Sequence, residues 1–123
     1  MKYQSEIKSI GSLALSFREE NMLILFGEKA NSGIEDYSMI IQTPSAPVSI
    51  FPGDVFQIGQ ASYTVTAVGE RVGELFSTLG HCTLCFDAQS QARLPGTIHL
   101  KGKYPDCRAG DIVSINGKEK ETE

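Results

Sequence analysis

The sequence predicts a mainly β fold, a small closed barrel of short strands with one short helix. Short apolar, β-branched or aromatic stretches recur along the chain, and clusters of Gly, Pro, Asn and Asp separate them. Side chains also alternate in character, so that Tyr63, Val65 and Ala67 share one strand face while Thr64 and Thr66 share the other. Many short strands at fairly regular spacing are typical of a barrel or a sandwich. Strands are expected at Tyr3–Ile10, Met22–Phe26, Tyr37–Gln42, Val55–Ile58, Ser62–Val68, Cys82–Phe86, Thr97–Leu100 and Ile112–Ile115.

One segment, residues 70–79, departs from the strand pattern and predicts a short helix. Its apolar side chains follow the i, i+3, i+4, i+7 spacing of a single helix face, at Val72, Leu75, Phe76 and Leu79. Gly80 lies just past the last of them, where a left-handed C-terminal cap is favoured. We expect this helix to cover one face or mouth of the barrel.

Length and composition indicate one globular domain over residues 1–117, followed by a charged tail, residues 118–123. The longest apolar run, Met22–Phe26, is too short to cross a bilayer, and Met1–Lys8 lacks the apolar core of a signal peptide. These features favour the cytoplasm. A net charge of −4 with eleven scattered basic residues argues against nucleic acid as a partner.

The three cysteines include a CxxC motif formed by Cys82 and Cys85. In an extended strand, residues three apart point to opposite faces, so these two thiols are not expected to share a metal or a disulfide. With Cys107 they make an odd count, which suggests free thiols in a reducing compartment. The sequence carries no phosphate loop, no dinucleotide fingerprint and no serine hydrolase elbow, and we expect neither a metal nor a cofactor.

The two histidines, His81 and His99, are the residues that ordinarily titrate near neutral pH. In its predicted strand His99 shares a face with Thr97 and Lys101, which predicts that it faces solvent or a polar cleft. His81 follows the helix cap directly. Either imidazole is a competent phosphoryl acceptor at pH 7. The alternative for each is a surface or hydrogen-bonded strand histidine without a chemical role.

Three parts of the chain together resemble one protein family, from about residue 5 to residue 117. The matching stretches are Asn21–Phe26 with Ile34–Tyr37, then Phe51–Asp54, Phe56–Gln60 and Tyr63–Gly69, and finally Leu79–Asp87 with Leu94–Leu100. They resemble the glucitol/sorbitol-specific IIA component of the phosphoenolpyruvate-dependent phosphotransferase system. The resemblance implies a closed β barrel in which a histidine takes a phosphoryl group from the phosphocarrier HPr and passes it to a IIB domain. IIB then phosphorylates the polyol as the membrane IIC domain imports it, so the membrane association is indirect.

The chain departs from the family at the phosphorylated histidine, which lies four residues after the tyrosine that matches Tyr37. That position is Ile41 here, and a second family histidine corresponds to Thr43. Isoleucine takes no phosphoryl group, and a threonine ester has low transfer potential. Three interpretations follow: the alignment shifts locally, the acceptor is His99 or His81, or the chain is a non-catalytic or regulatory binding module with the same fold. A barrel that binds a small ligand unrelated to sugar transport is a further, weaker hypothesis.

Overall fold

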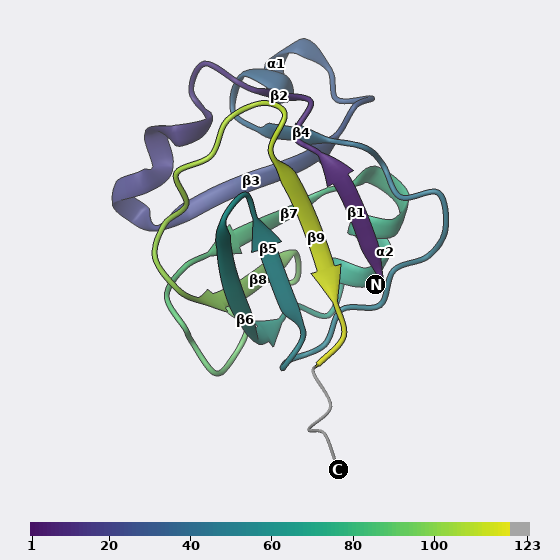
Figure 1. Ribbon diagram of the computed structural model, residues 1–123, viewed down its shortest axis with the longest axis vertical. Helices are drawn as coiled ribbons and strands as arrows, with labels where there is room; N and C mark the ends of the chain where they lie inside the picture. Colours follow the sequence, from purple (N-terminus) through teal and green to yellow (C-terminus); the bar gives the residue numbers. More distant parts are fainter. Residues whose placement is uncertain (119–123) are drawn as a thin grey trace.

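The computed structural model describes residues 1–118, which form one strongly curled sheet with three short helices (Figure 1). The strands are β1 (Tyr3–Glu6), β2 (Ser9–Ile10), β3 (Met22–Gly27), β4 (Met39–Ile41), β5 (Val55–Ile58), β6 (Ala61–Val68), β7 (Cys82–Cys85), β8 (Thr97–Lys101) and β9 (Ile112–Asn116). The helices are the 3-10 helix η1 (Ala14–Glu20), α1 (Ser32–Asp36) and α2 (Val72–Leu79). Of the predicted charged tail, only Lys118 belongs to the described residues. No helix in residues 1–118 has the length and apolar character needed to span a bilayer.

The two edge strands of the sheet are neighbours in the chain, which links the edges to each other. The strand order is β1-β9-β5-β6-β8-β7-β3-β4-β2. Between β1 and β2, the N–H of Ile7 donates to Asp111 O beside β9, and the N–H of Lys8 donates to Ile40 O in β4. Residues 3–10 therefore bridge both edges, and the predicted mainly β, barrel-like fold is confirmed.

The predicted strands agree closely with the observed ones, while two helices were not predicted. The segment Val55–Ile58 is reproduced as β5, and the expected strand Tyr3–Ile10 is divided into β1 and β2. The five-residue helix α1 begins after Asn31, whose Oδ1 accepts the N–H of Ile34 at 3.1 Å. Helix η1 lacks such a side-chain cap. Both are too short to leave a helical period in the sequence.

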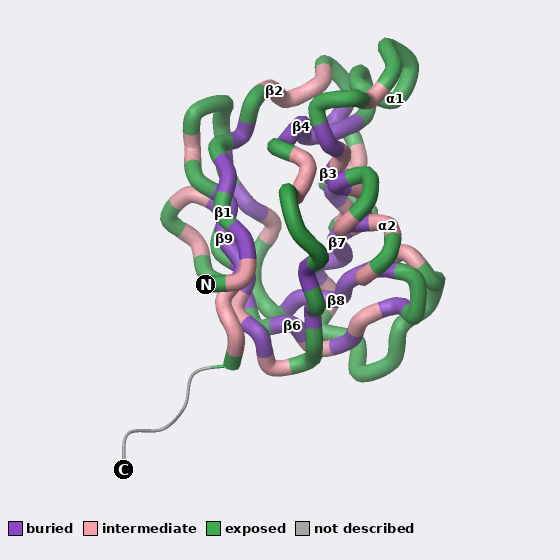
Figure 2. The backbone as a smooth tube through the Cα atoms, turned by 90° about the vertical axis from the view of Figure 1, so that its right-hand side faces the viewer, coloured by how far each residue is buried: buried purple, intermediate pink, exposed green. Residues whose placement is uncertain are grey.

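The interior of the curled sheet holds the apolar core, and α2 closes one side of it. The alternation predicted for β6 is confirmed, because Tyr63, Val65 and Ala67 are buried. In α2, Phe76 is fully buried and meets the ring of Tyr3 edge-on, with centroids 5.1 Å apart. Figure 2 shows buried backbone concentrated in the strands, whereas α1 is exposed at the surface.

The end of α2 is fixed by two glycines that allow backbone to pack on backbone. Gly80 takes the predicted left-handed cap conformation, with φ of 67°, and its N–H donates to Phe76 O at 2.8 Å. A Cβ on Gly80 would lie 2.9 Å from both N and Cα of Gly27 in β3. This close approach sets residue 81, the next in the chain, directly against β3.

Two glycine substitutions, one inside α2 and one at its C-terminal cap, are expected to change stability in opposite directions. Gly80→Ala should lower the free energy of unfolding by at least about 1–2 kcal/mol, because it strains a left-handed residue and adds a clash. Gly73→Ala should raise it by about 0.5–1 kcal/mol, because Gly73 lies inside the helix. A Cβ there would meet only Val48 O, at 4.0 Å. Urea unfolding measures both; a Gly80→Ala variant as stable as the parent chain would contradict the packing described here.

Candidate functional site

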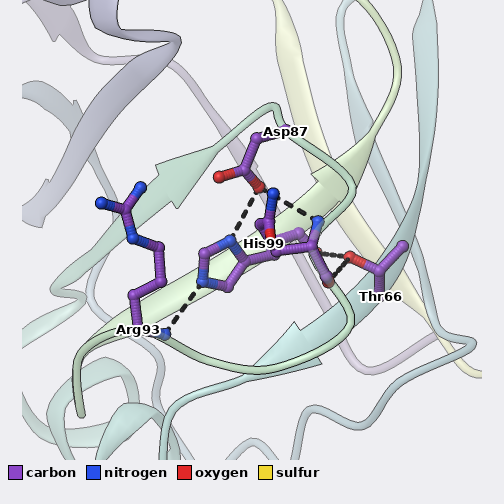
Figure 3. A network of polar contacts seen from close by, with 5 residues as sticks. Thr66, Asp87, Arg93 and His99 are labelled. Carbon is purple, nitrogen blue, oxygen red and sulfur yellow. Dashed lines mark hydrogen bonds and ion pairs between the residues drawn. The ribbon is translucent and has the colours of Figure 1, made fainter.

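His99 lies in the middle of β8 with both ring nitrogens engaged and no exposed surface (Figure 3). Its Nδ1 lies 2.7 Å from Oδ1 of Asp87, and its Nε2 lies 3.3 Å from the backbone nitrogen of Arg93. A carboxylate oxygen only accepts, so Nδ1 carries the proton, and Nε2 accepts the Arg93 N–H with its lone pair. Both nitrogens of this ring are therefore occupied by hydrogen bonds.

The expectation that His99 faces solvent or a polar cleft is wrong, because residues 86–96 cover that face of the sheet. The N–H of Ala88 donates to β8 at 3.0 Å. The hydroxyl of Thr66 donates to the carbonyl of Gln89 at 2.7 Å, and the carbonyl oxygen of His99 lies 3.2 Å from the same hydroxyl (Figure 3). Strand alternation gives the side of a residue correctly, but it carries no information about a loop that packs over that side.

Asp87 joins His99 to the loop and is held in its ionised form. Burial alone would raise the pKa of its carboxyl, but the hydrogen bond from His99 and that from the Gln89 N–H outweigh burial and lower the pKa. The Gln89 nitrogen lies 3.3 Å from Asp87 Oδ1. The network of Thr66, Asp87, Gln89 and His99 therefore stabilises the covering loop.

Cys85, Asp87 and His99 have ligand atoms within 4.8 Å of one another, and these residue types are those that bind zinc. The hydrogen bonds argue against a metal here. An ion on Nδ1 of His99 would require the proton on Nε2, where the Arg93 N–H already donates. Burial also raises the pKa of the Cys85 thiol, which favours the protonated form. The cluster fits a structural network better than a metal site.

The CxxC cysteines point to opposite faces of β7, as predicted. Cys82 is fully buried in the hydrophobic core, whereas Cys85 pairs in register with His99 of β8. Cys82, Cys85 and Cys107 are all free thiols.

His81 differs from His99 in having one engaged nitrogen and partial exposure. Its Nδ1 lies 3.1 Å from Leu25 O, and its ring packs on Phe26 with centroids 4.7 Å apart. A carbonyl oxygen only accepts, so Nδ1 carries the proton of the neutral ring, and in that tautomer Nε2 keeps its lone pair. Nε2 has no hydrogen-bond partner among residues 1–118. Every buried side-chain nitrogen or oxygen in these residues does have a partner. An unpaired Nε2 is therefore not buried, and it is open to solvent.

An apolar cavity of about 400 Å³ lies beside His81. We call it the His81 groove; it is lined by Phe17, Ile24, Phe26, Gly33, Ile34, Tyr37, Ser38 and His81. Its walls come from η1, β3, and α1 with the residues that follow it. The sequence did not predict this groove, because its side chains come partly from the two unpredicted helices.

The resemblance aligns two family histidines with Ile41 and Thr43 of this chain, and these two residues lie in different surroundings. Ile41 is fully buried in the core and pairs in register with Gly27. Thr43 is half-buried. Its hydroxyl oxygen is the nearest atom to a Cβ built on Gly27, and its Cα lies 3.6 Å from a Cβ built on Gly80. Position 43 thus adjoins the turn that carries His81, while position 41 faces the interior.

Comparison with known proteins gives a consistent result. The family described as the PTS system glucitol/sorbitol-specific IIA component matches residues 2–114. The chain is 39% identical over 104 residues to the PTS system glucitol/sorbitol-specific EIIA components of Escherichia coli (strain K12) and Shigella flexneri, and the match covers 85% of this chain and of each relative. The crystal structure of the PTS system IIA component from Enterococcus faecalis V583 superposes with a TM-score of 0.83 at 26% identity, covering 93% of this chain and 99% of that one.

The lowered pKa of Asp87 predicts a pH-dependent contribution to stability. The ionised carboxylate stabilises the folded state fully above 3.8, its ordinary pKa, and that contribution is lost as pH falls through the lower folded value. Asp87→Asn should therefore have a lower free energy of unfolding than the parent at neutral pH. The difference in free energy of unfolding between the two should narrow below about pH 4. Urea unfolding across this range tests it, with Asp106→Asn as the exposed control. A difference that is constant with pH would contradict the assignment.

Proposed function

This chain belongs to the glucitol/sorbitol-specific IIA family of the phosphotransferase system, and from that premise we propose that it carries phosphoryl groups during the uptake of a sugar alcohol. HPr is the donor, Nε2 of His81 is the acceptor atom, and IIB, working with the membrane domain IIC, is the next acceptor. The relay takes place in the cytoplasm. The observation that supports His81 is its hydrogen bond from Nδ1 to Leu25 O, which in the neutral ring leaves the lone pair on Nε2, a nitrogen without a partner among residues 1–118.

The transfer needs only an in-line displacement. The lone pair of His81 Nε2 attacks the phosphorus of phosphohistidine on HPr; the N–P bond to HPr breaks as the new one forms, and the leaving nitrogen keeps the bonding pair. The His81 ring gains positive charge, and the Leu25 carbonyl stabilises that charge through Nδ1–H. A phosphoryl group on nitrogen keeps a high transfer potential, so IIB can take it by the same displacement.

His99 is less suited to this role. Its Nε2 lone pair already accepts the Arg93 N–H, and the side chain has no exposed surface. Phosphorylation there would require residues 86–96 to leave the sheet and the bond to Asp87 to be exposed. His81 needs neither change.

The acceptor is tested by phosphorylation with labelled phosphoenolpyruvate, enzyme I and HPr. His81→Asn should lose the label, because the asparagine amide keeps a donor near the place of Nδ1 and removes the nucleophilic Nε2. His99→Asn is the matched control, and it should retain the label because its amide still reaches Asp87. The label on the parent chain should be acid-labile and base-stable. Label that persists in His81→Asn would contradict the assignment of the acceptor.

The burial of Ile41 favours a second candidate, a non-catalytic or regulatory binding module. The family's histidine position holds an apolar side chain with no exposed surface, so the usual nucleophile is absent. This second hypothesis predicts that the parent chain takes no label but still binds HPr or IIB. The same labelling experiment therefore separates the two candidates.

A further inference from the structure

The His81 groove brings several large apolar side chains together, and two of them remain exposed. Ile34 and Tyr37 have exposed fractions of 36% and 46%. The ring of Tyr37 lies 6.1 Å from that of Phe17, and the ring of Phe26 packs on His81. Contiguous exposed apolar surface of this kind is typical of an interaction site.

The groove is held in shape by hydrogen bonds that do not involve its apolar side chains. The hydroxyl of Ser38 donates to Ile34 O at 2.7 Å, which ties the end of α1 to the start of β4. The N–H of Leu13 donates to Asp36 O at 2.8 Å, and that of Gly11 donates to Ser38 O at 2.9 Å. A preformed groove lowers the entropic cost of binding a partner.

The segment that supplies most of the groove's lining is acidic, and we call its exposed carboxylates the acidic rim. Residues 17–37, which supply most of its lining, contain five exposed carboxylates and two cations: Glu19, Glu20, Glu28, Glu35 and Asp36 against Arg18 and Lys29. The guanidinium of Arg18 lies over the ring of Tyr104 at 5.1 Å, and no lysine or arginine lines the cavity in the part of the chain described. A free phosphorylated small molecule would be repelled here. A protein with basic side chains would be attracted.

We propose that the His81 groove is the docking surface for the phosphoryl donor, a protein that inserts an apolar side chain between Phe26, Ile34 and Tyr37 and places basic side chains against the acidic rim. The proposal rests on the proposed function in identifying that donor as HPr. The apolar contact positions the donor over Nε2 of His81, and the basic side chains neutralise the phosphoryl charge that this chain itself does not neutralise.

Ile34→Gln tests the apolar contact, with Ile112→Gln as the matched control. Ile112 lies in β9, is exposed to 41%, and is absent from the groove. In calorimetric titrations with purified unphosphorylated HPr, Ile34→Gln should weaken binding about tenfold, because a buried amide without a partner replaces an apolar contact. Ile112→Gln should bind as the parent does, and both variants should unfold at the parent's urea midpoint.

Glu35→Lys tests the acidic rim. It should slow association with HPr and make the association rate less sensitive to salt, because the attraction between the two surfaces is reduced. Glu70→Lys, a change of the same sign at an exposed residue before α2, is the control. Equal rates and equal salt dependence in the two variants would overturn the charge argument.

The outcomes separate docking from transfer. Ile34→Gln that binds HPr as tightly as the parent overturns the proposal, as does a parent chain that does not bind HPr. If the parent chain is a dimer, and Ile34→Gln dissociates it without changing the affinity for HPr, the proposal is overturned. The groove would then bind a second copy of this chain. If HPr binds through the groove but no label is transferred, docking stands and the phosphoryl-carrier role falls. If Ile34→Gln is labelled normally at subsaturating HPr, the role stands and docking falls.

Discussion

The close contact between Gly27 and Gly80 is the constraint on which the position of His81 depends. With no side chain on either residue, the cap of α2 approaches β3 until backbone meets backbone. The next residue, His81, is thereby placed against Leu25, whose carbonyl receives the Nδ1 proton. The glycine contact thus fixes where the imidazole lies, and the Leu25 carbonyl favours the proton on Nδ1.

The two histidines show that hydrogen-bond partners, more than residue type, decide what an imidazole does. At His99 an acceptor faces Nδ1 and a donor faces Nε2, so the ring is fully used in holding the loop of residues 86–96. At His81 an acceptor faces Nδ1, and Nε2 has no hydrogen-bond partner among residues 1–118. The first arrangement favours stability. The second leaves a nucleophile available.

The parts of the fold that follow from local pattern were predictable from the sequence, and the parts that depend on distant segments were not. Strand alternation in β6 and the apolar spacing of α2 are local, so both elements were predicted nearly to the residue. The burial of His99 depends on a loop packing over the sheet. The His81 groove depends on η1 and α1, which are too short to show a period. The resemblance to the family identified both histidines without distinguishing between them.

The surroundings of His81 also bear on the direction of transfer under the proposed function. A phosphoryl group on Nε2 would bring negative charge beside an apolar groove with an acidic rim, and burial in such a place penalises charge. With the donor's basic side chains present the charge is neutralised, and when the donor leaves the phosphorylated ring is destabilised. Departure of the donor would therefore raise the tendency of the group to move on to IIB. A relay needs this property, because a carrier that stabilised its phosphoryl group strongly would retain it.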